Sequence, residues 1–512
     1  MKPSYYLTTP IYYVNDKPHI GHAYTTLACD VLARFKRLDG YDVMFLTGTD
    51  EHGQKVQKSA EDKGIDPKDF TDDVSQNFRD LTATLNFTND DFIRTTEPRH
   101  YAACQQLWQK LMDNDAIYLG SYAGWYAVRD EAFYAESEIV DGKAPSGAPV
   151  EWVEEPSYFF RLSAFEDKLL AHYDANPDFV APKSRFNEVR SFVSGGLNDL
   201  SVSRASFSWG VPVPGDDAHV MYVWLDALTN YMTAAGYGQP DGDETYARRW
   251  PADLHMVGKD ILRFHAVYWP AFLMAAELPL PKRVFAHGWW TNEGQKISKS
   301  LGNVIDPVQI AETYGLDQMR YFLLREVPFG NDGDFSHQAM VHRMNGDLAN
   351  DLGNLSQRVL SMIFKNCEAT MPAAPATLTA ADQALLGAID GLLDIQRDCY
   401  DRQAFHDALK AVWDQVGEAN RYVDEMAPWA LRKTDPARMA EVLWVLAESL
   451  RQFAILMQPV MPEAAANMLD QLGIDEDKRG FDHLGADHRL AGGQSLEKPT
   501  PVFPRFVEEE SA

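Results

Sequence analysis

The N-terminal part of the chain reads strand, helix, strand, and this order constrains the fold more than any other feature. Residues 5–9 are β-branched and aromatic, which is typical of a buried strand, and residues 43–46 are again apolar. Between them, apolar residues recur at helical spacing, at Leu27, Val31, Phe35 and Leu38. A strand, a helix and a strand within about 45 residues predict a βαβ unit and therefore a parallel sheet. Ligands bind beyond the carboxyl ends of such strands, so residues 19–22 and 50–52 are candidate site residues.

The rest of the chain changes character twice. Its 512 residues are too many for one ordinary domain. Residues 118–222 are rich in glycine, proline and acidic residues, as in an inserted α+β segment, and parallel-sheet patterning then resumes. Beyond residue 341, apolar residues follow two helical stripes, Phe405, Leu409, Val412, Val416, Ala419 and Val423, and Met439, Leu443, Leu446, Leu450, Phe453 and Met457. We expect an α/β domain with a parallel sheet in residues 1–117 and 223–340, interrupted by the insertion at 118–222, and an all-α bundle with a tail in 341–512.

The composition indicates which cellular compartment and which kinds of partner to expect. The net charge of −28 argues by itself against a nucleic-acid partner, but it describes the average field, so a local basic site stays possible. The four cysteines form no CxxC pair, which argues against a disulfide framework and a thiolate zinc site. The N-terminus has no signal-peptide pattern, and apolar runs are broken by charged residues and proline. We therefore expect a soluble, cytoplasmic protein without a membrane partner.

Two histidines stand three residues apart at the predicted strand-to-helix turn, in "TTPIYYVNDKPHIGHAY", residues 8–24. Gly21, between His19 and His22, allows a ligand to approach the backbone closely. The N-terminus of a helix favours a phosphate, and histidine N–H groups can stabilise charge that develops on a phosphoryl group. The alternative is a capped helix start with two surface histidines, since four residues are a short motif.

A lysine-rich loop, "GQKISKSLGN" at residues 294–303, carries Lys296, Ser298, Lys299 and Ser300 between glycines. It has no apolar periodicity, so we expect an exposed loop. It can close on a triphosphate during the reaction, because closing loops commonly complete such sites and lysine meets phosphate as a compact charge. The alternative is a solvated lid or linker with incidental lysines.

Two aromatic segments complete the candidate site. "YVWLDALTNY", residues 222–231, spaces Val223, Ala227 and Tyr231 by four, so a helix there would place them on one face beside Trp224. "VGKDILRFHAVYWP", residues 257–270, carries a glycine turn with Gly258 and Lys259, followed by Phe264, His265 and Trp269 at helical spacing. Ordinary core packing is the alternative for both segments, although a histidine within an aromatic stripe is less easily explained by packing.

Taken in order, these motifs resemble the class I aminoacyl-tRNA synthetases, whose signatures are HIGH and KMSKS. The first stands here as His19-Ile20-Gly21-His22, and the second as Lys296-Ile297-Ser298-Lys299-Ser300, with isoleucine for methionine at its second place. Within the class, the chain is similar to the methionyl-tRNA synthetases over essentially its whole length, in blocks such as "FLTGTDEHG", "SVSRASFSWGVPVP", "YVWLDAL" and "NGDLANDLGNLSQR". The insertion of about 105 residues is too short for the editing domain of the leucine, isoleucine and valine enzymes.

The resemblance implies a Rossmann-type catalytic domain that joins L-methionine to tRNA(Met), initiator tRNA included, through methionyl-adenylate, with ATP and Mg²⁺. It assigns catalysis to His19, His22, Lys296 and Lys299, and ATP binding to these four together with Gly21, Gly258, Lys259 and Ser298. Methionine binding falls to Ile11, Tyr13, Asp50, Val223, Trp224, Ala227, Tyr231, Phe264, His265 and Trp269, with Asp50 on the ammonium group. Aromatic edges suit a soft thioether, and a polar partner near sulfur, His265 or Tyr231, would sharpen discrimination against leucine.

The resemblance also bears on metal and tRNA binding. Many members of the family carry a zinc knuckle in the insertion, but Ala127, Asp130 and Ala144 stand about where cysteines are expected, so we predict no structural zinc. The helical part matches the anticodon-binding bundle, with Asn420, Arg421 and Trp429 as candidate contacts, and we expect a monomer. Another class I synthetase, a nucleotidyltransferase of the related fold, and a non-catalytic tRNA-binding paralogue stay open as alternatives.

Overall fold

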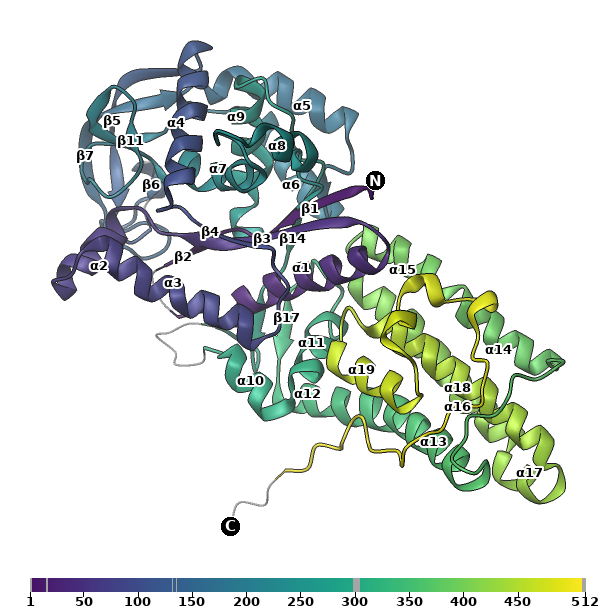
Figure 1. Cartoon of the computed structure of the whole chain (residues 1–512). Helices are drawn as coiled ribbons and strands as arrows, with labels where there is room; N and C mark the ends of the chain where they lie inside the picture. The colour runs from purple at the N-terminus through teal and green to yellow at the C-terminus, as the bar shows by residue number, and fades with distance from the viewer. Residues whose placement is uncertain (1, 15–16, 131, 135, 298–303, 509–512) are drawn as a thin grey trace. The chain divides into compact units, whose positions relative to one another are not determined.

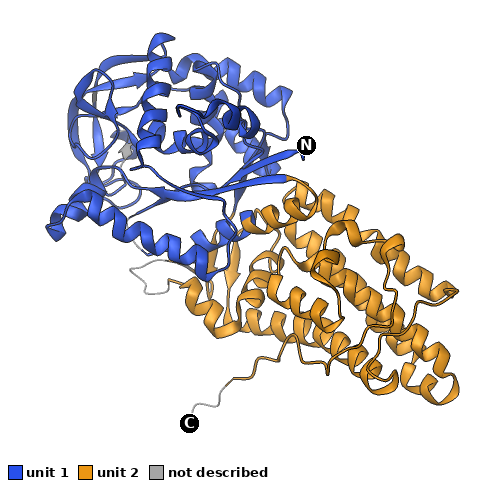
Figure 2. Cartoon of the chain, viewed as in Figure 1, with its two compact units in different colours: residues 1–29, 42–287 blue, residues 30–41, 288–512 orange. Residues whose placement is uncertain are grey.

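The computed structural model describes residues 2–14, 17–130, 132–134, 136–297 and 304–508 (Figure 1). The chain forms two compact units, shown in different colours in Figure 2. The first comprises Met1–Cys29 and Asp42–His287, and the second comprises Asp30–Tyr41 and Gly288–Ala512. Helix α1 (Ile20–Leu38) contributes residues to both units.

A parallel sheet organises the first unit. Among the described residues it has seven strands in the order β2-β3-β1-β13-β14-β8, with β4 paired to β3, and every pairing is parallel. The strands are β1 (Ser4–Thr8), β2 (Tyr12–Tyr13), β3 (Asp42–Asp50), β4 (Asp91–Arg94), β8 (Val180–Ala181), β13 (Leu254–Gly258) and β14 (Val284–His287). The predicted βαβ unit is therefore confirmed as β1, α1 and β3. Its strands carry nearly continuous buried residues because helices cover a parallel sheet.

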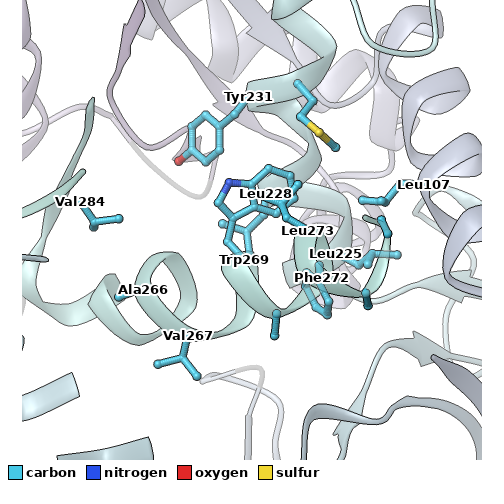
Figure 3. Close-up of a cluster of buried hydrophobic side chains, with 14 of the residues drawn as sticks. Leu107, Leu225, Leu228, Tyr231, Ala266, Val267, Trp269, Phe272, Leu273 and Val284 are labelled. Atoms are coloured by element: carbon cyan, nitrogen blue, oxygen red, sulfur yellow. The ribbon is translucent and has the colours of Figure 1, made fainter. Parts of the chain in front are cut away.

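The first unit has further helices, most of which pack on the main core, whereas α2 (Gln54–Lys63) and α3 (Pro67–Thr84) pack on a smaller core. The others are α4 (Pro98–Asp113), α5 (Glu166–Ala175), α6 (Lys183–Ser194), α7 (Val223–Ala235), α8 (Asp243–Arg249) and α9 (Trp269–Ala275). Helix α7 contacts β3, β4, α4 and α9. Figure 3 shows Tyr231 and Leu228 of α7 in one buried cluster with Trp269 and Phe272 of α9. The core thus fixes the two aromatic segments of the sequence against each other.

The predicted insertion, residues 118–222, folds in part as antiparallel sheet. It also contains α5, β8 and α6, which belong to the parallel sheet and its core. One antiparallel sheet has the order β6-β5-β7-β9, from β5 (Ile117–Ala127), β6 (Ala132–Tyr134), β7 (Glu151–Phe160) and β9 (Leu200–Ser201). A smaller one has the order β10-β12-β11, from β10 (Ser203–Arg204), β11 (Pro212–Val213) and β12 (Asp216–Met221). The long β5–β7 ribbon pairs Ile117 with Phe160 and continues to Tyr126 and Glu151.

The second unit is mostly helical. Its helices are α10 (Pro307–Tyr314), α11 (Leu316–Arg325), α12 (His337–Arg343), α13 (Asn354–Asn366), α14 (Ala380–Asp390), α15 (Leu392–Asp401), α16 (Phe405–Met426), α17 (Pro428–Thr434), α18 (Pro436–Met457) and α19 (Pro462–Gln471). A small sheet joins β15 (Trp290–Asn292) to β16 (Gln295–Lys296) and β17 (Gly333–Phe335). The two apolar stripes predicted from the sequence form the buried faces of α16 and α18. Every helix in the described ranges is too short or too polar to cross a bilayer.

Candidate active site

The HIGH motif lies at the start of α1, which follows β2 and begins at Ile20. The backbone N–H of His19 donates to Nδ1 of His22 (3.1 Å), and the backbone N–H of Gly21 donates to Nδ1 of His19 (3.0 Å). The two imidazole rings lie 3.9 Å apart between centroids. A Cβ atom at Gly21 would come within 2.9 Å of Cε1 of His19, so a larger residue here would displace the folded-back ring of His19.

These two hydrogen bonds fix the protons on both histidines. A backbone N–H can only donate, so each Nδ1 must be a bare acceptor, and each neutral ring carries its proton on Nε2. Burial lowers the pKa of His19, against a smaller raising effect of Asp260. Burial, and then the neighbouring His19, hold the pKa of His22 well below its usual range. The motif therefore presents two neutral imidazoles, each with one Nε2–H donor for a ligand.

The other predicted ATP-binding residues fall in both units. Gly258 ends β13, Lys259 begins a single 3₁₀ turn, and Gly258 is in register with His287 of β14. Thr25 of α1 is hydrogen-bonded to Nε2 of His287 (2.7 Å), which joins the HIGH helix to the end of β14. Lys296 is the last residue of β16 in the second unit, while Ser298 and Lys299 lie outside the described residues.

Asp50 is the last residue of β3 and is buried. The two residues after it are tied down by their side chains. Glu51 accepts two hydrogen bonds from the guanidinium of Arg94 (2.6 and 2.8 Å), and His52 contacts Asp226 of α7 (2.6 Å). The turn that carries Asp50 is therefore anchored to β4 and to α7, and it lies at the same sheet edge as the HIGH motif.

Most of the predicted methionine pocket comes together in one cluster. Trp224 and Phe264 stack with ring centroids 3.3 Å apart, and Tyr231 lies 6.3 Å from Trp269. Ile11 packs against the same core, and Ala227 is buried on α7. Val223 is half-buried at the first position of α7. Tyr13 differs, because it packs against a separate small core formed by α2 and α3.

Tyr231 and His265 form a closed polar pair inside this cluster. Nδ1 of His265 is 2.9 Å from the carbonyl oxygen of Ile261, which can only accept, so Nδ1 carries the proton. Burial lowers the pKa of His265 to about 4, so its Nε2 is bare and accepts from the Tyr231 hydroxyl (2.6 Å). The single hydroxyl proton of Tyr231 is thus used within the protein, and the pocket offers a thioether mainly aromatic surface.

The positions expected to hold zinc do not offer a ligand set. Ala127 and Ala144 pack with Ala148 into a small apolar cluster that has no ligand atoms. The Asp130 carboxylate accepts hydrogen bonds from the hydroxyls of Tyr134 (3.0 Å) and Ser146. Structural zinc takes four sulfur, nitrogen or oxygen ligands. A single carboxylate that already accepts two hydrogen bonds, with alanine methyl groups at the other positions, does not provide the four ligands of a structural zinc site.

The predicted anticodon residues lie on the second unit. The side-chain amide of Asn420 donates to the Asp351 carbonyl (2.9 Å), and Arg421 pairs with Glu418 (2.8 Å) on the exposed face of α16. Trp429, at the start of α17, is 46% exposed, which is unusual for so large an apolar side chain. An exposed indole can stack on a nucleobase.

The structure adds residues that the sequence reasoning did not single out. Arg358 of α13 donates to Asn420 (3.4 Å) and pairs with Asp424 (3.1 Å), so it belongs to the same surface. The block "NGDLANDLGNLSQR" contains Arg358 and was the only sequence signal for it. His52, His100 and Asp226 meet in the first unit, and His100 had no sequence signal because it lies in an ordinary helical pattern.

Comparisons with known proteins agree with this geometry. A family model described as tRNA synthetases class I (M) matches residues 5–149 and 144–360, and one described as the anticodon binding domain of methionyl tRNA ligase matches 371–512. A methionine–tRNA ligase of Mesorhizobium japonicum is 58% identical over 100% of this chain and 99% of its own length. One of Rickettsia felis is 57% identical over 99% of each chain.

Solved structures also match the chain over nearly its whole length. Mycobacterium tuberculosis methionyl-tRNA synthetase in complex with methionyl-adenylate matches with a TM-score of 0.95 at 55% identity, over 99% of this chain and 100% of that one. The apo form of the same enzyme matches with a TM-score of 0.89 at 52% identity, over 99% of each chain. With matches of this extent and identity along its whole length, the chain belongs to the methionyl-tRNA synthetase family of the class I aminoacyl-tRNA synthetases.

Proposed function

We propose that this chain activates L-methionine with ATP and transfers the methionyl group to the 3′ end of tRNA(Met), initiator tRNA included. A carboxylate oxygen of methionine attacks the α-phosphorus of ATP, the bond from this phosphorus to the bridging oxygen breaks, and pyrophosphate leaves. A hydroxyl of the terminal ribose of the tRNA then attacks the carbonyl carbon of the adenylate, and AMP leaves. Mg²⁺ arrives with ATP and offsets part of the phosphate charge.

The observation that carries the proposal is the pair of neutral imidazoles at the start of α1. Their Nε2–H groups donate to phosphoryl oxygens as negative charge develops there, and donors fixed in advance need no reorganisation during the reaction. No protein nucleophile is needed, because positioning and charge stabilisation carry such a step. Lys296 and Lys299 add positive charge to the phosphates, and Gly21, Gly258, Lys259 and Ser298 complete the nucleotide site.

Asp50 holds the ammonium group of methionine in this proposal. The side chain of methionine lies among aromatic rings, supplied by Trp224, Tyr231, Phe264, His265 and Trp269, with Ile11, Tyr13, Val223 and Ala227. Rings suit a thioether because sulfur packs favourably against their edges. On the second unit, Asn420, Arg421 and Trp429 read the anticodon, and Arg358 joins them. The catalytic domain comprises residues 1–117 and 223–340 around an insertion at 118–222, with the tRNA-binding part at 341–512. The enzyme acts as a cytoplasmic monomer without zinc.

Exchange of labelled pyrophosphate into ATP, run with each standard amino acid in turn, tests the proposal. We expect exchange with methionine alone, followed by charging of tRNA(Met) when the tRNA is added. Exchange with a different amino acid would assign another specificity. tRNA binding without any exchange would indicate a non-catalytic paralogue.

A further inference from the structure

A buried carboxylate joins three elements of the first unit. Oδ2 of Asp226 on α7 lies 2.6 Å from Nδ1 of His52, in the turn after β3, and Oδ1 lies 2.7 Å from Nε2 of His100 on α4. The exposed fractions are 1% for Asp226, 2% for His52 and 0% for His100. A charged carboxylate buried this deeply is unstable unless it is paired and fully hydrogen-bonded. The hydrogen bonds from the two imidazoles therefore decide whether the Asp226 carboxylate is stable in this position.

Hydrogen bonding places a proton on Nε2 of His100. Nε2 lies 2.7 Å from Oδ1 of Asp226, and a carboxylate oxygen can only accept, so Nε2 carries the hydrogen and donates. Nδ1 of His100 lies 3.2 Å from the Thr233 hydroxyl, so both ring nitrogens have a partner inside the protein.

His52 donates to the other carboxylate oxygen. Nδ1 of His52 donates to Oδ2 of Asp226, while its Nε2 lies 3.0 Å from the hydroxyl of Tyr101 on α4. Burial, followed by the charge of Asp226, raises the pKa of Tyr101, so its hydroxyl keeps its proton. Each oxygen of the Asp226 carboxylate is therefore hydrogen-bonded to a histidine of a different element.

The spacing fits hydrogen bonds better than a metal. Ligand atoms of His100, Cys104 and Asp226 lie within 4.8 Å of one another, as a metal site requires. In tetrahedral zinc coordination, metal–ligand distances of about 2.0–2.1 Å place a nitrogen and an oxygen ligand about 3.3 Å apart. The separation of Asp226 and His100 here is 2.7 Å, which is a charge-assisted hydrogen bond. Burial also raises the pKa of Cys104, which stays a thiol.

The cluster lies between the two parts of the candidate methionine site. Asp226 is in the first turn of α7, together with Val223 and Trp224, and precedes Ala227. This helix begins after Tyr222 without a side-chain cap, so tertiary contacts fix its first turn. His52 is two residues from Asp50 in the chain.

We propose that Asp226, hydrogen-bonded to both His52 and His100, is a positioning residue for methionine. It holds the first turn of α7, which carries the side-chain pocket, in register with the turn that carries the ammonium-binding carboxylate. This inference rests on the proposed function, because it uses the methionine site as assigned there. It adds a role for three residues that do not themselves touch methionine.

Steady-state pyrophosphate exchange with D226N, H100Q and H52Q tests the proposal on the full-length chain. We expect KM for methionine to rise about 10- to 100-fold in D226N and H100Q, since small displacements of positioning groups have effects of this size, while KM for ATP changes much less. The D226N/H100Q double variant should resemble D226N, because both changes break one unit. KM does not depend on the fraction of folded enzyme, so partial unfolding does not obscure the result.

Two matched controls separate positioning from general destabilisation. D382N removes another buried carboxylate, which pairs with Arg438 in the second unit, and should leave KM for methionine unchanged. C104S replaces a thiol that contacts Nε2 of His100 (3.2 Å) and the Asp226 carbonyl oxygen (3.8 Å) by a hydroxyl that can make the same contacts, and should also leave it unchanged. A methionine KM in D226N no higher than in D382N would overturn the proposal.

A spectroscopic measurement tests the proton assignment directly. With ¹⁵N-histidine label in the full-length enzyme, His100 (identified by its loss in H100Q) should show hydrogen on Nε2, and the Nε2 signal should shift in D226N. A His100 whose Nε2 carries no hydrogen in the parent enzyme would refute the assignment. If the parent enzyme exchanges no pyrophosphate with methionine, the proposed function fails; if it does so and D226N matches it, only this inference fails.

Discussion

At the scale of single residues, the candidate active site depends on which ring nitrogen of each histidine carries the proton. The HxGH motif indicated a phosphate site, but not the state of its rings. The structure fixes that state through backbone N–H groups, which occupy Nδ1 of both His19 and His22. A neutral imidazole with an outward Nε2–H donates to a phosphoryl oxygen without the repulsion that two adjacent imidazolium ions would suffer.

Replacing His22 should therefore lower catalysis more than binding. We expect H22N to reduce kcat for methionine-dependent pyrophosphate exchange about 10²- to 10³-fold, the usual effect of removing one transition-state donor, with KM for methionine nearly unchanged. The half-buried His172 of α5, changed in H172N, is the control. A loss in KM with kcat retained would contradict the role given to His22.

His265 makes the stability of the folded state depend on pH. Its folded pKa is about 4, whereas an unfolded histidine titrates near 6.5. Between these values the unfolded chain binds a proton that the folded chain does not, so stability is lost as pH falls, by about 3 kcal/mol over the whole window. We expect thermal scans of the parent protein to show a larger fall in Tm from pH 7.5 to pH 5 than scans of H265Q. The control variant H488Q, which changes an exposed histidine, should show the same fall in Tm as the parent protein.

At the scale of elements, packing and hydrogen bonds hold the part of the insertion around Asp130. Ala127, Ala144 and Ala148 form a small buried cluster, and Tyr134 and Ser146 donate to the Asp130 carboxylate. These contacts stabilise a short antiparallel ribbon by burial and hydrogen bonding, and we predict that its folding does not require a metal.

Removing divalent metal should thus leave this element folded. We expect less than stoichiometric zinc in the purified protein and the same Tm before and after dialysis against EDTA. D130A should lower the free energy of unfolding by about 0.5–1.5 kcal/mol, the usual net contribution of a hydrogen bond, because water can replace the lost acceptor of the exposed Ser146 hydroxyl. One equivalent of tightly bound zinc, lost together with stability on chelation, would contradict this account.

At the scale of the whole molecule, most of the candidate active site lies in the first unit, while Lys296 and the candidate tRNA surface belong to the second. The histidines, Asp50 and the aromatic pocket lie in the first, while Arg358, Asn420 and Trp429 lie in the second. The net charge of −28 shows that tRNA binding cannot rest on the average field, so local cations and stacking must supply it.

This division predicts a separation of activities. We expect W429A to weaken kcat/KM for tRNA charging about 5- to 100-fold, the equivalent of 1–3 kcal/mol for a lost stacking contact, and to leave pyrophosphate exchange intact. R358A should behave in the same way, with a shallower dependence of charging on salt. The exposed Trp152 of β7, changed in W152A, provides a matched exposed tryptophan as control. Equal losses in charging and exchange would contradict the assignment.

The sequence by itself determined the family, the βαβ unit, the buried faces of the long helices and most of the candidate pocket, because periodicity and short motifs are local properties. Only the tertiary structure decided which residues that are far apart in the sequence contact each other. His52 meets Asp226 across 174 positions and His100 meets it across 126, so only the packing of α4 and α7 could reveal that they share one carboxylate. It likewise decided the proton positions on His19 and His22, the separate packing of Tyr13 and the pairing of Arg358 with Asn420, since each depends on which atoms folding brings within hydrogen-bond or contact distance.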